Sequence, residues 1–407
     1  METYVFLSLK EGFVPAGKLS FQDDPQNASA TFAYGRRYLE RKDAISLDPG
    51  LLPLGKQIFT TATGFPLFSA FRDSGPDRWG RYLLSKRFGR ALNEFEYILA
   101  VGANRIGALA FGPDLSSPAI LGPEGFEPYE TKELDLALCV KATCDAVKET
   151  ESAELRDLLK YGSSIGGARP KAAVTWMGKP YLAKFSTSLD TRNEPLIEYA
   201  TMRLAGLVGI DIPEIHTEKI LGRDVYLVER FDRSLENGNE KKIALLSGLT
   251  MMQLHESDYD AWSYGALCQA IKKYSDTMRE DLHELFKRMV FNILVNNNDD
   301  HPRNHAFIHT SEDHWRLSRA YDLVPLDQRT QTFRLALIVG DSGKEASKEN
   351  AFSRCDLFNL SRRAAQQIWA HIEEVVTHEW ERIYLESGIS EEQVDRFRNS
   401  IGTEYKI

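Results

Sequence analysis

The amino-acid sequence predicts an α+β protein built from two lobes, the first rich in strands and the second all-α, with a further α+β subdomain ahead of both. Three observations predict this. A chain of 407 residues exceeds the size at which one hydrophobic core keeps growing. After an N-terminal α+β part, strand-like hairpins mark the lobe that ends near residue 233, and helical periodicity dominates the rest. A stretch rich in Pro, Gly and Ser at residues 114–128 is typical of a linker. We therefore expect domains at residues 1–125, 126–233 and 234–407.

Composition narrows the class of protein. With 43% apolar and 27% charged residues, the chain is typical of a soluble globular protein. The net charge of −9 argues against a broad surface for nucleic acid or membrane. The four cysteines form no CxxC pair and fit buried thiols in a reducing compartment. Since we find neither a secretory signal nor an apolar run of 18 residues, we expect a cytoplasmic protein that does not contact membranes.

The N-terminal subdomain is expected to combine strands and helices. Alternating apolar residues predict strands at Tyr4–Leu9 and Ala28–Tyr34, and a later one at Ile106–Phe111. A helix is expected after Asp77, which can cap it, and a second helix at Asn93–Val101. The aromatic residues of these helices are expected to lie in the core.

A glycine-rich turn opens the next lobe, after expected helices at Glu133–Thr150 and Ala153–Leu159. Residues 162–169 read GSSIGGAR, with little side chain, so their backbone N–H groups can approach phosphate oxygens closely. Arg169 and Lys171 add positive charge directly after the turn. Because turns of this composition are common, this one is weak evidence by itself.

A lysine follows on a predicted strand. Ala172–Trp176 and Tyr181–Phe185 alternate as a hairpin, and the second strand contains Lys184. In protein kinases, a strand lysine paired with a helix glutamate holds the α- and β-phosphates of ATP. A lysine on a strand is more often a solvated edge residue, so its role depends on the neighbouring motifs.

The helix expected at Asn193–Val208 offers two glutamates to pair with this lysine, Glu194 and Glu198. Glu198 lies within the apolar stripe of the helix and is the favoured partner, although Glu194 stays open. A second hairpin, at Ile215–Leu221 and Val225–Arg230, then leads to the position where a kinase joins its lobes. There Phe231 would pack on adenine or belong to the ordinary core.

The stretch richest in candidate catalytic residues follows a helix expected at Glu280–Asn296. Asp299 and Asn304 have the spacing of a kinase catalytic loop, in which the Asp orients the attacking hydroxyl and the Asn binds a metal. Strands expected at Ala306–His309 and Trp315–Ser318 would return Asp322 to Asn304, giving Mg²⁺ hard oxygen ligands. The alternative is a solvated turn, because Asn, Asp and His favour turns.

Further helices are expected at Ser263–Ile271, Arg362–Thr377 and Glu391–Ile401. The order of the chain is then a β-rich lobe with a glycine turn and a lysine, followed by a helical lobe with an acidic loop. This order predicts a two-lobed, protein-kinase-like fold.

The chain resembles the HipA family of bacterial serine/threonine kinase toxins. The resemblance rests on five motifs in this order: SSIGGARPK, YLAKF, LVERFDR, NNNDDHPRN and YDLVP. The segment FRDSGPDRWGRYLL is similar to the N-terminal subdomain of that family, so the resemblance covers nearly the whole chain. It implies a kinase that uses ATP and Mg²⁺.

The resemblance also implies a role for single residues. Asp299 would be the catalytic base or would orient the hydroxyl, Asn304 and Asp322 would bind Mg²⁺, and Lys184 would hold the phosphates. The remaining positions for the nucleotide would be the phosphate loop at Ser164, Gly166, Gly167 and Lys171, and the adenine hinge at Glu229 and Phe231. Ser164 matches the serine that family members autophosphorylate. The glycine turn departs from the G-x-G-x-x-G of ordinary protein kinases, and His301 has no assigned role.

Family resemblance implies partners as well. They are a helix-turn-helix antitoxin, operator DNA bound mainly through that antitoxin, and a protein substrate such as an aminoacyl-tRNA synthetase. Two other functions stay open. One is a nucleotide-binding scaffold that represses transcription with the antitoxin. The other is a phosphohydrolase with two metals, whose ligands would be Asp299, Asp300, His301, His305 and Asp322.

Overall fold

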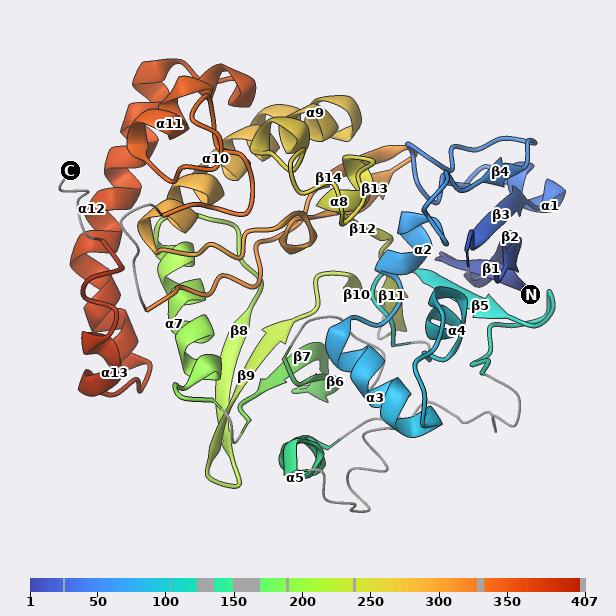
Figure 1. Cartoon of the computed structure of the whole chain (residues 1–407), viewed down its shortest axis with the longest axis horizontal. Helices are drawn as coiled ribbons and strands as arrows, with labels where there is room; N and C mark the ends of the chain where they lie inside the picture. Colours follow the sequence, from blue (N-terminus) through green and yellow to red (C-terminus); the bar gives the residue numbers. More distant parts are fainter. Residues whose placement is uncertain are drawn as a thin grey trace. The chain divides into compact units, whose positions relative to one another are not determined.

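A computed structural model describes residues 1–24, 26–102, 104–122, 135–148, 169–187, 190–236, 239–327 and 333–402 (Figure 1). The described chain forms two compact units. Unit 1 contains residues 1–189, 218–246 and 311–313, and unit 2 contains residues 190–217, 247–310 and 314–407. Antiparallel sheets dominate unit 1 and helices dominate unit 2, so the α+β class is confirmed. The two-lobed kinase arrangement and the domain boundaries expected at residues 125 and 233 stay predictions.

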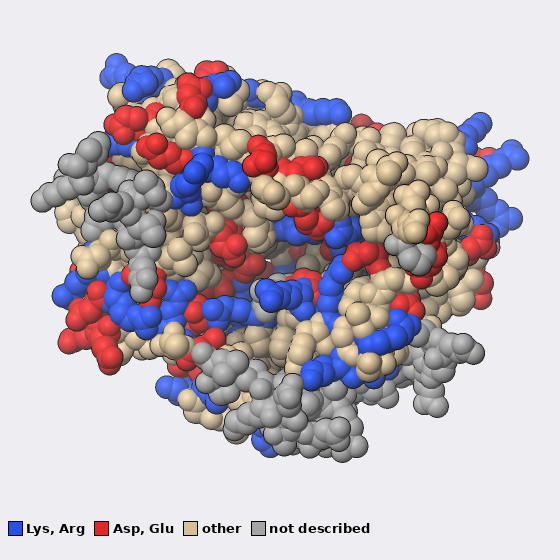
Figure 2. All heavy atoms as spheres, in the orientation of Figure 1, with Lys and Arg blue, Asp and Glu red and all other residues tan. Residues whose placement is uncertain are grey.

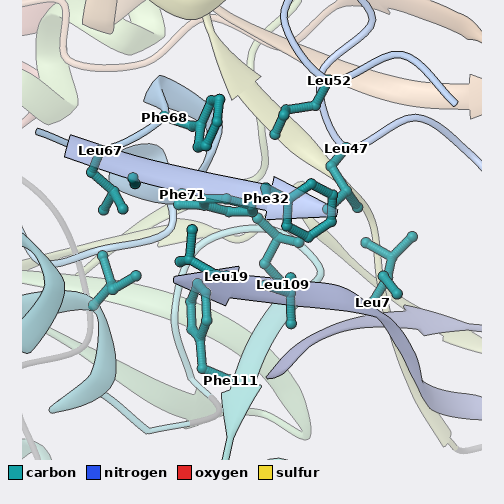
Figure 3. Close-up of a cluster of buried hydrophobic side chains, with 14 of the residues drawn as sticks. Leu7, Leu19, Phe32, Leu47, Leu52, Leu67, Phe68, Phe71, Leu109 and Phe111 are labelled. Atoms are coloured by element: carbon teal, nitrogen blue, oxygen red, sulfur yellow. The ribbon is translucent and has the colours of Figure 1, made fainter. Parts of the chain in front are cut away.

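An antiparallel five-stranded sheet forms the N-terminal part of unit 1. Its strand order is β4-β3-β2-β1-β5. The strands are β1 (Glu2–Leu9), β2 (Gly12–Gln22), β3 (Ser29–Tyr34), β4 (Phe59–Thr60) and β5 (Leu109–Gly112). Side chains from this sheet and from helix α2 pack together in a buried core, as Figure 3 shows for Leu19, Phe32, Phe71 and Phe111. The alternation in the sequence therefore marks the inward face of this sheet.

Some of the helices of unit 1 begin at capping side chains. They are α1 (Arg36–Leu39), α2 (Ser69–Asp73), α3 (Arg78–Phe88), α4 (Glu94–Leu99) and α5 (Leu136–Lys148). The Asp77 carboxylate accepts hydrogen bonds from two backbone amides of α3, so the predicted cap is confirmed. Asn93 and Glu96 form a capping box on α4.

A second antiparallel sheet of four strands has the order β6-β7-β9-β8. The strands are β6 (Lys171–Trp176), β7 (Lys179–Phe185), β8 (Ile215–Ile220) and β9 (Arg223–Glu229). Each hairpin closes through two residues with positive φ, Met177 and Gly178 in one and Leu221 and Gly222 in the other. Such loops match the twist of the strands. Trp79 and Leu83 of α3 pack in the core of this sheet, which makes the N-terminal part and the sheet one unit.

Two short sheets complete the strands. The polar stretch after residue 233 forms the hairpin β10 (Arg233–Glu236) and β11 (Asn239–Lys242). The other sheet has the order β12-β13-β14 and contains β12 (Leu245–Ser247), β13 (Ala306–Ser311) and β14 (His314–Leu317). The second lobe was expected to be all-α. Unit 2 instead contains the hairpin of β13 and β14. Strand β14 alternates between more exposed and buried residues, and this alternation buries Trp315 and Leu317.

Unit 2 is built around helix α10 (Met278–Leu294), whose C-terminal half is almost completely buried. The other helices are α7 (Glu194–Leu207), α8 (Gly248–Met251), α9 (Tyr264–Tyr274), α11 (Lys348–Ser353), α12 (Arg362–Glu386) and α13 (Glu391–Asp395). Short 3₁₀ helices lie at η1 (Pro302–Asn304) and η2 (Cys355–Phe358). Helices α7 and α12 lie side by side (Figure 1), where the hydroxyls of Thr201 and Tyr384 hydrogen-bond at 2.7 Å.

Helix lengths in unit 2 differ from prediction at the C-terminus. Helix α12 runs nine residues beyond the expected end at Thr377, because Trp380, Ile383 and Tyr384 continue its buried face. Helix α13 ends at Asp395 and not at Ile401. Within the described residues, no helix is both long enough and apolar enough to cross a membrane.

Candidate active site

The predicted catalytic loop follows directly from the buried end of α10. Asn296 leaves the helix with a φ of +61°, and η1 ends the loop at Asn304. The Asn304 side-chain amide donates a hydrogen bond of 2.6 Å to the carbonyl oxygen of Asp299. This bond joins the two ends of the loop and fixes their separation. An Asn in a solvated turn can form the same kind of bond, so the catalytic role of the loop stays a prediction.

Asp322 is brought to this loop by the β13–β14 hairpin. The Tyr321 hydroxyl donates to the carbonyl oxygen of Arg303 at 2.7 Å, one residue before Asn304. Asp322 has a φ of +55°, in the left-handed region, which few residues other than glycine adopt. Backbone strain of this kind is concentrated at functional sites, where the surrounding structure maintains it.

A small cavity lies beside Asn304 and Asp322. Its volume is about 10 Å³, the room that one water molecule needs. It is lined by Arg288, Asn292, Asn297, Asp300, Asn304, His305, Ala320, Tyr321, Asp322 and Leu323. The two predicted metal ligands thus line one small cavity within unit 2.

Asp299 lies at the surface, with 75% of its side chain exposed. Desolvation and the nearby Asp322 carboxylate raise the pKa of Asp299, while His301 opposes them. The His301 Nε2 lies 3.8 Å from the Asp299 Oδ1. Solvent weakens these electrostatic effects on the Asp299 carboxylate because it is exposed. The carboxylate is therefore accessible at the surface of the loop.

The residue after Asp299 has the opposite environment. Asp300 is 2% exposed, and its carboxylate accepts hydrogen bonds from the Tyr264 hydroxyl and the Ala336 amide, both at 2.7 Å. Burial raises the pKa of Asp300 to about 7. From the sequence, Asp300 is expected only as a possible hydrolase ligand, because its buried partners lie 36 residues away on either side.

The two predicted phosphate-binding lysines lie opposite each other on adjacent strands of unit 1. Lys171 on β6 pairs with Lys184 on β7, and both are at least nine-tenths buried. Directly paired residues of an antiparallel ladder point to the same face of the sheet. The Lys184 ammonium lies 5.8 Å from the centre of the Tyr226 ring. The two ammonium groups therefore lie on one face of the sheet, and their contact with phosphate stays a prediction.

The predicted hinge residues, Glu229 and Phe231, lie next in sequence to members of a buried ionic cluster that was not predicted. In this cluster, the Arg230 guanidinium donates to the Asp232 carboxylate at 2.8 and 3.0 Å, and Arg233 donates to it at 2.9 Å. Burial alone raises the pKa of Asp232, but the two arginines outweigh it and hold that pKa well below its ordinary value.

The same ionic cluster holds a segment of the N-terminal subdomain. Arg230 donates to the carbonyl oxygens of Asn104 and Arg105 at 3.0 Å, and the Gly107 amide donates to Asp232 at 2.8 Å. The run of charges in RFDR is the available sequence sign of this cluster, although it does not reveal the partners.

Several predicted contacts stay predictions. Glu194 pairs with Arg192 at 2.6 Å, and Glu198 is buried on α7. Lys184 belongs to the other compact unit, so its pairing with either glutamate is not tested. Ser164, Gly166 and Gly167, with the helix expected at Ala153–Leu159, lie outside the described residues.

Comparison with known families covers both parts of the chain. Residues 163–380 match the HipA-like C-terminal domain, and residues 10–112 match the HipA N-terminal domain. The chain belongs to the HipA family. The predicted resemblance is confirmed.

HipA relatives of this chain include three proteins named as kinases. The chain is 23% identical over 360 residues to "Putative kinase Y4dM" of Sinorhizobium fredii, covering 83% of this chain and 81% of that protein. It is 22% identical over 316 residues to "Putative kinase Y4mE" of the same organism, covering 72% and 71%. A "Putative kinase" of Haemophilus influenzae is 25% identical over 150 residues, which are 35% of this chain and less than half, 44%, of that relative.

A solved HipA structure shares the fold. Shewanella oneidensis HipA, determined in complex with HipB and its operator DNA, superposes with a TM-score of 0.69 at 18% identity. The superposition covers 98% of this chain and 94% of the Shewanella chain. Nearly the whole chain therefore has the HipA fold.

The residues of the HipA site suit a magnesium ion that is bound together with phosphate. Among the described residues, no group of three or more His, Cys, Asp and Glu side chains is placed to hold a metal alone. Mg²⁺ commonly takes one or two carboxylates and completes its shell with water and phosphate oxygens. Asp322 and Asn304 both line one cavity, and a carboxylate residue and an amide residue together fit that pattern.

Proposed function

We propose that this protein is an ATP- and magnesium-dependent serine/threonine-protein kinase of the HipA type. The observation that carries the proposal is the common cavity of Asn304 and Asp322, next to the exposed carboxylate of Asp299. A kinase catalytic loop needs these three groups, two for the metal and one for the acceptor hydroxyl. The relatives named as kinases support the same activity.

The residues of the chain divide the chemistry between them. Asp299 would orient the acceptor hydroxyl and receive its proton, for which an accessible carboxylate is required. We assign the metal to Asn304 and Asp322, and Mg²⁺ bound there would neutralise charge on the phosphates. Lys171 and Lys184 would offer two ammonium groups to the phosphate oxygens. Because phosphoryl transfer has a loose transition state, such positioning and neutralisation supply most of the catalysis.

The buried Asp300 and His305 argue against a phosphohydrolase with two metals. Asp300 already accepts hydrogen bonds on both carboxylate oxygens, and His305 is 3% exposed. Both line the cavity, but the donors on Asp300 compete with any further metal there. A scaffold without catalysis would not require an exposed Asp299 beside a strained Asp322, so the kinase is favoured.

We further assign regulation and partners by family likeness. Ser164 would be autophosphorylated, and the substrate would be a translation-related protein such as an aminoacyl-tRNA synthetase. The Shewanella protein is described in complex with HipB and operator DNA, which supports a helix-turn-helix antitoxin as partner and DNA binding mainly through it. On the face drawn in Figure 2, basic and acidic side chains are interspersed. Such a mixed surface agrees with DNA binding through a partner.

The test uses the purified chain with Mg²⁺ and ATP labelled on the γ-phosphate. A kinase incorporates the label into protein serine or threonine, whereas a hydrolase releases it as free phosphate and a scaffold does neither. Mass spectrometry of the product locates the phosphate, and finding it never on Ser164 would refute autophosphorylation there. Comparing phosphoproteomes of cells that express the wild type or Asp299→Asn identifies the substrate.

A further inference from the structure

Two neighbouring residues of the catalytic loop have opposite environments. Asp299 is exposed, whereas Asp300 is buried and accepts hydrogen bonds from Tyr264 and Ala336. A buried carboxylate is costly unless donors satisfy it, and here each of its oxygens has a donor at 2.7 Å. Asp299 and Asp300 share a planar peptide unit, so fixing Asp300 leaves Asp299 little backbone freedom.

The same tyrosine is connected to Asp299 from the other side. Asn292 of α10 donates to the Tyr264 hydroxyl oxygen at 3.2 Å, and Asn297 donates to the Asn292 side-chain oxygen at 3.0 Å. The amide of Asp299 then donates to the Asn297 side-chain oxygen at 3.1 Å. The hydrogen-bonded chain therefore begins at Tyr264 and reaches the catalytic loop on both sides of the Asp299–Asp300 peptide.

This chain of bonds has no evident purpose in folding alone. Tyr264, Asn292, Asn297 and Asp300 are each at most 2% exposed. Apolar residues of the same shape in such a place are often as stable as polar ones. A fully bonded polar network provides a unique geometry instead. The group that needs such geometry is the exposed Asp299 side chain.

We propose that Tyr264 and Asp300 are positioning residues that hold Asp299 where it meets the acceptor hydroxyl. The assignment rests on the proposed kinase function. Both residues are buried, and the two oxygens of Asp300, which lines the cavity, are occupied by the Tyr264 hydroxyl and the Ala336 amide, so we assign neither residue a direct part in the transfer. Their effect would be on the rate of transfer and not on the binding of nucleotide.

The experiment compares Tyr264→Phe with a matched control on the same helix, Tyr274→Phe. Tyr274 is also buried, and its hydroxyl has no hydrogen-bond partner among the described residues. Steady-state kinetics and hydrogen exchange of residues 297–301 are measured on the full chain. We expect Tyr264→Phe to lower kcat roughly tenfold or more, with KM for ATP unchanged, and to speed exchange in the loop. The control should change neither.

Asp300→Asn provides a second variant, and the double variant tests the connection. Two residues that act through one network lose rate together, so the double variant should be no slower than the slower single variant. The assignment would be overturned if the loss of kcat in the double variant equalled the product of the two single losses. It would also be overturned if Tyr264→Phe kept the kcat and the hydrogen exchange of the wild type. A wild type that transfers no phosphate would refute the kinase function, while exchange in the loop would still decide whether Tyr264 positions Asp299.

Discussion

The Tyr321 hydroxyl donates a hydrogen bond of 2.7 Å to the carbonyl oxygen of Arg303. Each partner is followed by a proposed magnesium ligand, Asp322 after Tyr321 and Asn304 after Arg303. The bond therefore ties together the two backbone segments that carry these residues. A preformed pair reduces the entropic cost of binding Mg²⁺ with ATP. The predictions below follow from this site and from the buried charges of unit 1.

Asp299→Asn should leave nucleotide binding largely intact and lower phosphoryl transfer by roughly two orders of magnitude or more. The reason is that the amide cannot accept the hydroxyl proton. Label incorporation measures the rate, and titration calorimetry measures the binding. Asp260→Asn, a change at an exposed carboxylate of the same unit, is the control and should keep full activity. Full activity in Asp299→Asn would contradict the assigned role.

Asp322→Asn should weaken the binding of ATP in the presence of Mg²⁺. Asn tolerates positive φ nearly as well as Asp, so the backbone at +55° is preserved while the carboxylate ligand is lost. Calorimetric titration with and without Mg²⁺ separates the metal from the nucleotide. An affinity for Mg-ATP equal to that of the wild type would count against Asp322 as a ligand.

Lys184→Met should remove much of the thermal stabilisation that ATP confers. A tenfold weaker affinity reduces ligand stabilisation by about 1.4 kcal/mol when ATP is in excess. Differential scanning fluorimetry with increasing ATP measures this effect. Lys219→Met on β8 is the control, because that side chain is 68% exposed. Equal ATP-induced shifts in the two variants would show that Lys184 does not hold phosphate.

Asp232→Asn should destabilise the folded chain by about 3 kcal/mol or more, because it leaves Arg230 and Arg233 without their buried anion. Denaturant unfolding measures the change. Asp224→Asn breaks an ion pair of 3.7 Å with the exposed Lys219 and should cost less than about 1 kcal/mol. Similar losses in the two variants would mean that the buried cluster contributes no more than a surface pair.

Stability should also depend on pH through Asp300. Its pKa is about 7 in the folded chain, against an ordinary value of 3.8. Between these values the folded state binds more protons than the unfolded state, so the free energy of unfolding falls as pH rises. Asp300→Asn removes this contribution. Its stability relative to the wild type should therefore rise by roughly 2–3 kcal/mol from pH 5 to pH 8, measured by urea unfolding. A difference that does not change with pH would contradict the buried ionisation.

Local patterns predicted much of the fold correctly. The hairpin of β6 and β7 and the buried face of α10 follow from alternation and helical periodicity, which neighbouring residues determine. Capping by Asp77 was predicted for the same reason. The end of α12 was not, since its last turns are stabilised by packing of Trp380 and Tyr384 in unit 2.

By itself, the sequence determined the candidate residues Asp299, Asn304 and Asp322 and the elements that bear them, because their spacing and periodicity are local. Only the tertiary structure decided which groups surround them. The partners of Asp300 lie 36 residues away, and the carbonyl groups of Asn104 and Arg105 that Arg230 binds lie about 125 residues away. Burial and hydrogen bonding between such distant residues arise when elements pack, and no local propensity encodes them.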